Sequence, residues 1–230
     1  IAYFKFGDPQ GVFIKPVDNS YSPKLLFETV EPAFLGNWSN DGRYLVFSTA
    51  ADIGYFDFAD SSVTYLDYIN AEQEFFPMLS PDGKWLAYTS DDEAHNDHLY
   101  VVPFPGPGRA HRVSVEEGFA SVWAPDMSAI YFVGLDKKDI TLSQVDIITT
   151  SPQFSTSPPS VLFYGDYTTL YTFANPGRFK YGNSGVFDIH PDGNRFLMEQ
   201  AASDGEVEDA ELYRKLQVIV NWQGLLEGGI

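Results

Sequence analysis

One short pattern recurs four times along the chain and constrains the fold more than any other feature. Its copies read Trp38-Ser39-Asn40-Asp41-Gly42, Leu79-Ser80-Pro81-Asp82-Gly83, Trp123-Ala124-Pro125-Asp126-Met127 and Ile189-His190-Pro191-Asp192-Gly193. An apolar run follows each copy directly. The four aspartates, at positions 41, 82, 126 and 192, are 41, 44 and 66 residues apart. A period of about 40–45 residues with strand-like content is typical of an array of stacked β-repeats.

Each repeat reads as four short strands. In the second repeat the expected strands cover residues 75–79, 84–90, 98–104 and 111–115, with a turn at Ser80-Pro81-Asp82-Gly83. Proline presets φ at one turn position, aspartate can accept a hydrogen bond from the backbone, and glycine tolerates positive φ. Apolar residues do not alternate cleanly with polar ones, as expected when both faces of a sheet are covered. The sequence therefore predicts an all-β protein, a β-propeller with four-stranded antiparallel blades.

About five blades are visible. Three complete blades are expected at residues 33–68, 74–115 and 119–164, and two partial blades at 1–29 and 185–222, with an inserted connection at 164–184. The first partial blade lacks its first strand and the last lacks its fourth. Ile1 opens a strand-like run without an initiator methionine. We therefore expect a segment of a larger, six-bladed propeller whose remaining part lies upstream.

With these motifs in hand, the whole chain resembles the WD40-like, TolB-like propellers of bacteria. The resemblance rests on the repeated Ser-Pro-Asp-Gly turn and on the strand His98-Leu99-Tyr100-Val101-Val102-Pro103-Phe104. This strand and the closing run 218–226 make the chain similar to propellers at the C-terminal end of bacterial serine/threonine protein kinases and winged-helix regulators. The resemblance implies a sensor or scaffold domain, often outside the cytoplasm, without catalytic residues. The chain departs from the repeat at Asn40, where proline is expected, and at Met127, where glycine is expected.

Composition excludes several classes of function. The net charge is −18, from 14 basic and 32 acidic side chains. Such a surface repels nucleic acid, whose affinity for proteins comes largely from Lys and Arg, and it disfavours anionic membranes. The chain has no cysteine, so disulfides, thiolate metal sites and cysteine nucleophiles are excluded. No apolar run is long enough to span a bilayer.

Catalytic and metal-binding patterns are weak. No Gly-x-Ser-x-Gly motif or phosphate-binding glycine loop occurs, so we predict no catalytic residue, metal ion or cofactor. The repeat aspartates could form a ring of carboxylates, but a turn-capping role is favoured because they fall in four different blades. The loop 91–98 has acids and histidines suited to Ca²⁺ or Zn²⁺. Its spacing fits no EF-hand loop and the chain lacks His-Glu-x-x-His, so a solvated hairpin is favoured. The acidic run 204–211 is interpreted as solvated.

The connection 164–184 is the best candidate for partner binding. Its aromatic residues lie beside scarce positive charge, a combination that suits an anionic or carbonyl-rich partner. The predicted contact residues are Tyr167, Tyr171, Arg178 and Lys180. The alternative is a long connection packed over the propeller by its own aromatic side chains.

The sequence therefore favours a non-enzymatic propeller that binds a protein or small ligand on one face. The alternative is an accessory propeller of a multidomain enzyme, either a receptor-type serine/threonine kinase or a prolyl-oligopeptidase-like serine peptidase, whose catalytic domain lies elsewhere. A glycan-binding or glycan-cleaving propeller is a third possibility, and it would need carboxylates clustered in the central channel.

Overall fold

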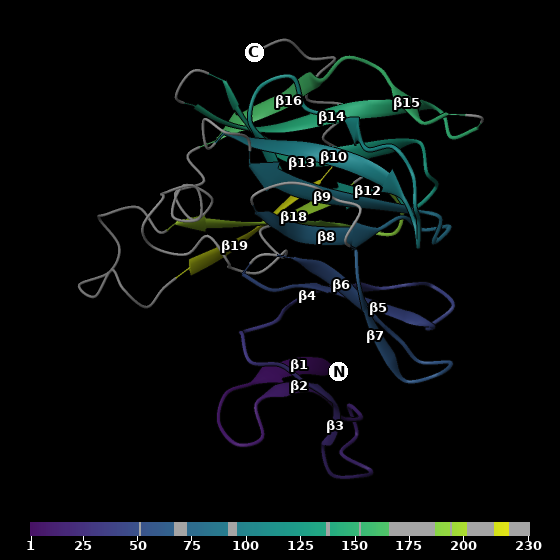
Figure 1. The fold of residues 1–230 in the computed structure, drawn as a ribbon. Helices are drawn as coiled ribbons and strands as arrows, with labels where there is room; N and C mark the ends of the chain where they lie inside the picture. The colour runs from purple at the N-terminus through teal and green to yellow at the C-terminus, as the bar shows by residue number, and fades with distance from the viewer. Residues whose placement is uncertain are drawn as a thin grey trace.

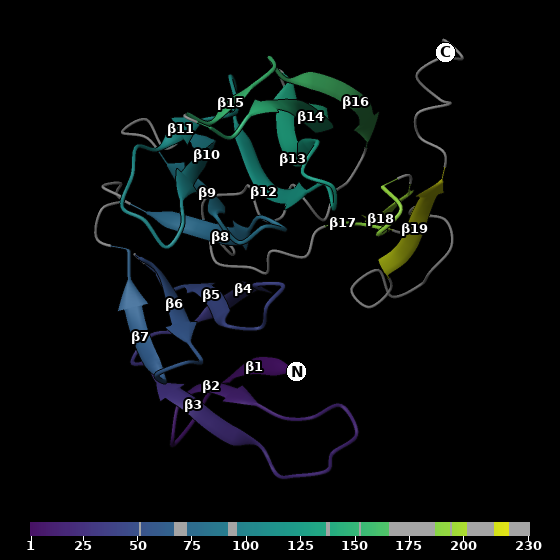
Figure 2. The same ribbon diagram turned by 90° about the vertical axis from the view of Figure 1, so that its right-hand side faces the viewer.

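A computed structural model describes residues 1–50, 52–66, 73–91, 96–136, 139–151, 153–165, 187–193, 195–201 and 214–220. These residues form strands and turns without a helix, in five antiparallel sheets that follow one another in chain order (Figure 1). In the view of Figure 2 the sheets trace an arc from the first sheet at the bottom to the last at the right. The predicted all-β propeller architecture is confirmed. Within the described ranges, no helix is long and apolar enough to cross a bilayer.

Four of the sheets are simple meanders. The first contains β1 (Ala2–Lys5), β2 (Gly11–Ile14) and β3 (Lys24–Glu28). The second contains β4 (Phe34–Trp38), β5 (Tyr44–Ser48), β6 (Ile53–Asp57) and β7 (Ser62–Tyr65). The third contains β8 (Glu74–Leu79), β9 (Trp85–Asp91), β10 (Asp97–Pro103) and β11 (His111–Arg112). The last contains β17 (Phe187–Ile189), β18 (Arg195–Ala201) and β19 (Arg214–Val220).

The fourth sheet has a divided outer edge. It contains β12 (Gly118–Trp123), β13 (Ala129–Asp136), β14 (Asp139–Thr149), β15 (Ser155–Thr156) and β16 (Ser160–Gly165). Both β15 and β16 pair with the long strand β14, one after the other along the same edge. Between them Ser157 still bonds to Asp146 of β14, and Pro158 and Pro159 interrupt the edge because proline has no N–H to donate to the ladder. The sequence predicted a four-stranded blade at residues 119–164, without a divided edge.

Apolar side chains gather between successive sheets rather than in one central core. Four clusters of buried residues fill these spaces. Val12, Phe47 and Phe56 lie between the first two sheets, and Val46, Leu86 and Val102 between the second and third. Interior sheets are therefore covered on both faces, which explains why their sequences lack a clean polar–apolar alternation.

The first strands of the complete sheets lie side by side and are joined through side chains. Asn37 of β4 donates from Nδ2 to the carbonyl of Leu79 in β8 (3.1 Å) and accepts from its N–H (2.7 Å). Trp123 of β12 donates from Nε1 to the carbonyl of Met78 (3.0 Å). Asn40 donates to the carbonyl of Pro81, in the turn one repeat later (2.8 Å). Asparagine in place of the expected proline thus links two blades.

Each of these inner strands carries a β-bulge at the same place. The register shifts between Leu35 and Trp38 in β4, and at the matching positions of β8 and β12. Phe76 and Ala120, inside the bulges of β8 and β12, have φ of 56° and 50°. Gly36 lies inside the bulge of β4, where an added Cβ would overlap the carbonyl oxygen of Pro77. The bulges bend the inner strands and increase their local twist.

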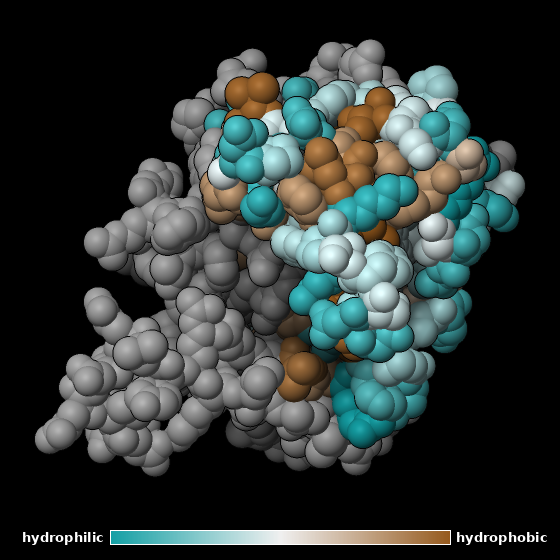
Figure 3. All heavy atoms as spheres, turned by 90° about the horizontal axis from the view of Figure 1, so that it is seen from below, coloured by the Kyte–Doolittle hydropathy of each residue, from teal (hydrophilic) through white to brown (hydrophobic). Residues whose placement is uncertain are grey.

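The first sheet has one side that no other described strand covers. On this side Tyr3 stacks on Phe13 (ring centroids 5.9 Å), and Lys5 Nζ lies 5.2 Å above the same ring. Phe13 is thereby left only 8% exposed. Figure 3, seen from below, shows apolar side chains interspersed with hydrophilic ones on this part of the molecule.

Candidate functional site

The repeat aspartates organise their own turns. Asp41 accepts a hydrogen bond from the hydroxyl of Ser39 (2.5 Å) and from the N–H of Arg43 (3.0 Å). Asp82 accepts equivalent bonds from Ser80 (2.6 Å) and Lys84 (3.1 Å). The Ser39 hydroxyl, with the Arg43 N–H, lowers the pKa of Asp41 below its usual value. The Asp41 carboxylate therefore stays ionised, and the carboxylates of Asp41 and Asp82 each stabilise the turn backbone of their own sheet.

The third and fourth turns keep the geometry with different residues. Met127 takes the glycine position with φ of 65°, so this turn holds a side chain in the left-handed region. Asp126 accepts a bond from the N–H of Ser128 (3.0 Å), and hydrogen bonding by the Ser128 side chain, then its backbone, lowers the pKa of Asp126. In the last turn Asp192 forms an ion pair with Arg195 (2.8 Å). The four aspartates belong to four sheets and do not form one site.

The strand order gives the propeller two distinct faces. The Asp-containing turns and the hairpin ends at 58–61 and 104–110 lie at one end of the strands, here called the turn face. The other end, here called the connection face, contains residues 6–10, 28–33, 49–50, 52 and 113–117. The registers place Gly165, the end of β16, beside Ile140, next to the β13–β14 hairpin end, so the link from β16 towards β17 starts from the connection face.

Charge is divided unequally between these faces. Described acids on the connection face are Asp8, Glu28, Glu31, Asp52, Glu74, Asp91, Asp97, Glu116 and Glu117. Among the described side chains, the basic residue at that end is Lys5. Described acids on the turn face are Asp18, Asp41, Asp57, Asp60, Asp82, Asp126, Asp146 and Asp192, and they alternate with Lys15, Lys24, Arg43, Lys84, Arg109, Arg112 and Arg195. Among the side chains that the structure describes, acids therefore outnumber bases more strongly on the connection face than on the turn face, although β19 also begins with Arg214 and Lys215 at that end.

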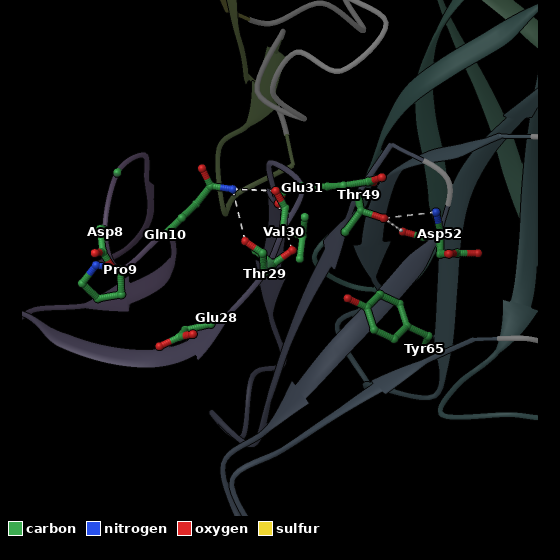
Figure 4. Close-up of a pocket in the computed structure, with 11 residues that line it drawn as sticks. Asp8, Pro9, Gln10, Glu28, Thr29, Val30, Glu31, Thr49, Asp52 and Tyr65 are labelled. Atoms are coloured by element: carbon green, nitrogen blue, oxygen red, sulfur yellow. Dashed lines mark hydrogen bonds between the residues drawn. The ribbon is translucent and has the colours of Figure 1, made fainter.

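A pocket of about 820 Å³ opens on the connection face between the first two sheets. Figure 4 shows its residues, which come from the β1–β2 hairpin, the link from β3 to β4, and the ends of β5, β6 and β7. Gln10 shapes one wall, because its amide donates to the carbonyls of Thr29 (3.1 Å) and Val30 (2.7 Å). Thr49 shapes the opposite wall, where its hydroxyl oxygen accepts from the N–H of Asp52 (3.3 Å).

Acidic groups dominate this pocket. Asp8, Glu28, Glu31 and Asp52 contribute to its lining together with Tyr65. Burial, with the negative charges of Asp52 and Glu31, raises the pKa of the Tyr65 phenol. The phenol therefore remains a hydrogen-bond donor at neutral pH, surrounded by acceptors. This lining suits a partner that presents basic side chains and carbonyl groups.

A buried row of polar residues crosses the third sheet near the same face. The register pairs Ser90 with both Glu74 and His98, so these three side chains share one face of the sheet. His98 Nδ1 lies 3.2 Å from the carbonyl of Glu116. Acid, serine and histidine together invite comparison with a hydrolase triad. Each is less than a tenth exposed, however, and Ser90 is only 4% exposed, so the hydroxyl is closed to a substrate here.

The predicted partner-binding residues Tyr167, Tyr171, Arg178 and Lys180 lie outside the described residues, as does the acidic run 204–211. Of the loop 91–98, residues 92–95 also lie outside them. Within the described ranges, no three histidine or acidic side chains come together as a metal-ion site. Sequence reasoning missed the pocket and the unequal faces. A signal for the unequal faces was present in the sequence, because most of the described basic residues lie in or beside the turn-face loops.

Comparison with solved structures places this fold among the TolB-like β-propellers. TolB from Acinetobacter baumannii superposes with a TM-score of 0.68 at 14% identity, over 96% of this chain and 48% of that one. A putative TolB from Agrobacterium tumefaciens gives 0.63 at 19%, over 86% and 62%. Oligogalacturonate lyase from Vibrio parahaemolyticus gives 0.57 at 11%, over 96% and 60%.

These similarities show the fold and no more. The resemblance to TolB-like propellers is confirmed at that level, whereas the narrower similarity to kinase and regulator propellers stays a prediction. The chain spans about half to three-fifths of the length of these structures. No protein-family model matches the sequence. No curated protein matches it either.

Proposed function

We propose that this chain is a non-enzymatic propeller domain that binds a basic protein segment on its connection face. One observation carries the proposal: the acid-lined pocket, the excess of carboxylates and the start of the link from β16 all lie on that face. A partner with clustered Lys and Arg would be attracted by its potential and oriented by it. Propeller neighbours of different activities share this fold, so function has to be argued from the site.

The connection 164–184 supplies the second part of the proposed interface. Tyr167 and Tyr171 would bury aromatic surface against the partner, while Arg178 and Lys180 would bind its carbonyl or carboxylate groups. Aromatic and arginine side chains are the residues that contribute most to protein interfaces. The acidic pocket would then supply attraction, and the connection would supply specificity.

The non-enzymatic part of the proposal is supported by the buried state of the only Ser–His–acid row found in the described residues. The glycan-cleaving alternative is not favoured by the described geometry, because the carboxylates lie around a pocket between two sheets. Whether a catalytic domain accompanies the propeller is decided by the reading frame of the parent gene.

The charge contribution can be tested with an oligolysine peptide as probe and the full chain immobilised. Neutralising the pocket with Glu28→Gln, Glu31→Gln and Asp52→Asn together should weaken binding several-fold at low salt, and the difference should shrink as salt rises. The matched control removes three charges from the turn face with Asp18→Asn, Asp60→Asn and Asp146→Asn. Equal weakening by both sets would show that only net charge matters and would refute the assignment of the face.

The connection is tested separately. For a partner identified by cross-linking to the immobilised chain, substituting Tyr167→Ala, Tyr171→Ala and Arg178→Gln together should abolish binding. Circular dichroism of the variant provides the folding control. Unchanged binding by a folded variant would remove the connection from the interface.

A further inference from the structure

One described arginine stands apart from the others. Arg43 forms an ion pair with Asp57 (2.8 Å), and Arg195 forms one with Asp192 (2.8 Å). Arg112 donates from Nε to the carbonyl of Ser114 (2.9 Å) and from its terminal nitrogen to that of Val115. Arg109, in contrast, is exposed and has no hydrogen bond or ion pair with the residues that the structure describes. Its charge is available to a ligand.

Arg109 borders a pocket of about 290 Å³ between the third and fourth sheets. The walls are β11 of the third sheet and β15 of the fourth, the two short outer-edge strands. Phe154 forms an apolar wall and is itself only 3% exposed. Its ring packs against Trp85 (4.9 Å between centroids), Trp123 (6.0 Å) and His111 (6.1 Å). The pocket therefore has a rigid apolar side fixed by three other rings.

The remaining walls offer donors from several directions. Arg109, Arg112 and His111 come from the third sheet, and the hydroxyls of Ser155 and Thr156 come from the fourth. No carboxylate belongs to the described lining. The His111 imidazole and both hydroxyls have no hydrogen bond to the described residues, so they can turn towards a ligand. Burial, with the charge of Arg109, lowers the pKa of His111, which is therefore a neutral N–H donor at pH 7.

We propose that this pocket binds a phosphate group, either as the free ion or carried by a small ligand. A guanidinium can approach the oxygens as a planar fork, and hydroxyl and imidazole donors can engage the remaining oxygens of the tetrahedral group. The volume lies at the lower end of the range for small-molecule sites. It leaves space beside Phe154 for a short carbon skeleton.

The negative charge of the chain restricts where an anion can bind. With a net charge of −18, the surface as a whole repels anions. An anion that binds must therefore find a local concentration of donors, and the described segment 109–112 provides one. The site also lies at the turn face, away from the acidic pocket, and it does not depend on the function proposed above.

The proposal is tested by titrating the full chain with inorganic phosphate and with glycerol 3-phosphate, while following backbone amide resonances. Both probes should shift the amides of 109–113 and 154–156 in a saturable way. Arg109→Gln should raise the Kd about tenfold or more, because a charge-assisted contact is lost. His111→Gln, which keeps a donor in reach, should have a smaller effect. Lys84→Gln is the matched control, because it removes an exposed cation from the same face outside the pocket.

The two probes separate the sources of the phosphate. Equal affinities indicate a site for the free ion, and tighter binding of glycerol 3-phosphate indicates a ligand that extends along Phe154. The proposal is overturned if neither probe gives saturable shifts at these residues. It is also overturned if Arg109→Gln binds phosphate as tightly as the wild-type chain and the Lys84→Gln control.

Discussion

The side chain of Asn37 is expected to make an unusually large contribution to stability for a polar residue on an inner strand. It both donates to and accepts from the backbone of Leu79, at 3.1 and 2.7 Å, and so joins the second sheet to the third. Leu79 is only 2% exposed, so water cannot replace the lost partner. Asn37→Ala removes two hydrogen bonds of about 1 kcal/mol each and leaves a buried N–H unpaired, which costs about 1–3 kcal/mol.

We therefore expect Asn37→Ala to lower the free energy of unfolding by about 2–4 kcal/mol. For a chain of this size the corresponding fall in Tm is about 10 °C. Urea unfolding followed by tryptophan fluorescence and by circular dichroism measures the change. Asn40→Ala is the comparison, because it removes one exposed bond to Pro81 and should cost about 0.5 kcal/mol. If Asn37→Ala costs no more than Asn40→Ala, the inner strands are not held together in this way.

Two further predictions concern a glycine and a histidine. Gly36→Ala should destabilise the chain by up to about 3 kcal/mol, because the new Cβ would overlap Pro77. Gly42→Ala, at φ of 73° in open space, should cost about 1 kcal/mol. Thermal unfolding measures both variants, and a greater loss of stability for Gly42→Ala than for Gly36→Ala would contradict the prediction. Arg109→Gln should raise the pKa of His111, because a nearby positive charge is removed. NMR titration of the imidazole measures this change, and an unchanged pKa would show that the two groups do not interact. Since folding lowers this pKa, the neutral imidazole contributes stability above about pH 6.5 that is lost as pH falls.

The architecture was predictable because its signals are local. A serine, an aspartate and a glycine fix each of the first two turns through bonds within six residues, as Ser80 and Asp82 show. The apolar runs on either side then form strands. The role of Asn40 could not be read in the same way. Its partner, Pro81, lies one repeat further on, and only the stacking of blades brings the two together.

The bulges and the divided edge depend on tertiary structure. Phe76 and Ala120 have strand-compatible side chains, yet both take positive φ because the inner strand must bend around its neighbours. The strand β15 has only two residues, Ser155 and Thr156, too few to show a periodicity. It forms because β14 is long enough to offer an unpaired edge beyond β16.

The two candidate sites were harder to predict from the sequence than the fold was. The phosphate pocket joins Arg109 and His111 to Ser155 and Thr156, more than 40 residues away in the sequence. The acidic pocket joins the ends of two sheets in the same manner. Net charge did not indicate either pocket, because a single total cannot show that the described bases gather at one end of the strands while acids occur at both.

The hydrogen bonds that join the inner strands of neighbouring sheets, through Asn37, Asn40 and Trp123, all lie towards the Asp-containing ends. Loops on the connection face can therefore change in length or sequence without breaking these hydrogen bonds between neighbouring sheets. Because the apolar clusters between the sheets also remain, a chain of this kind can acquire new binding partners at that end with little loss of stability.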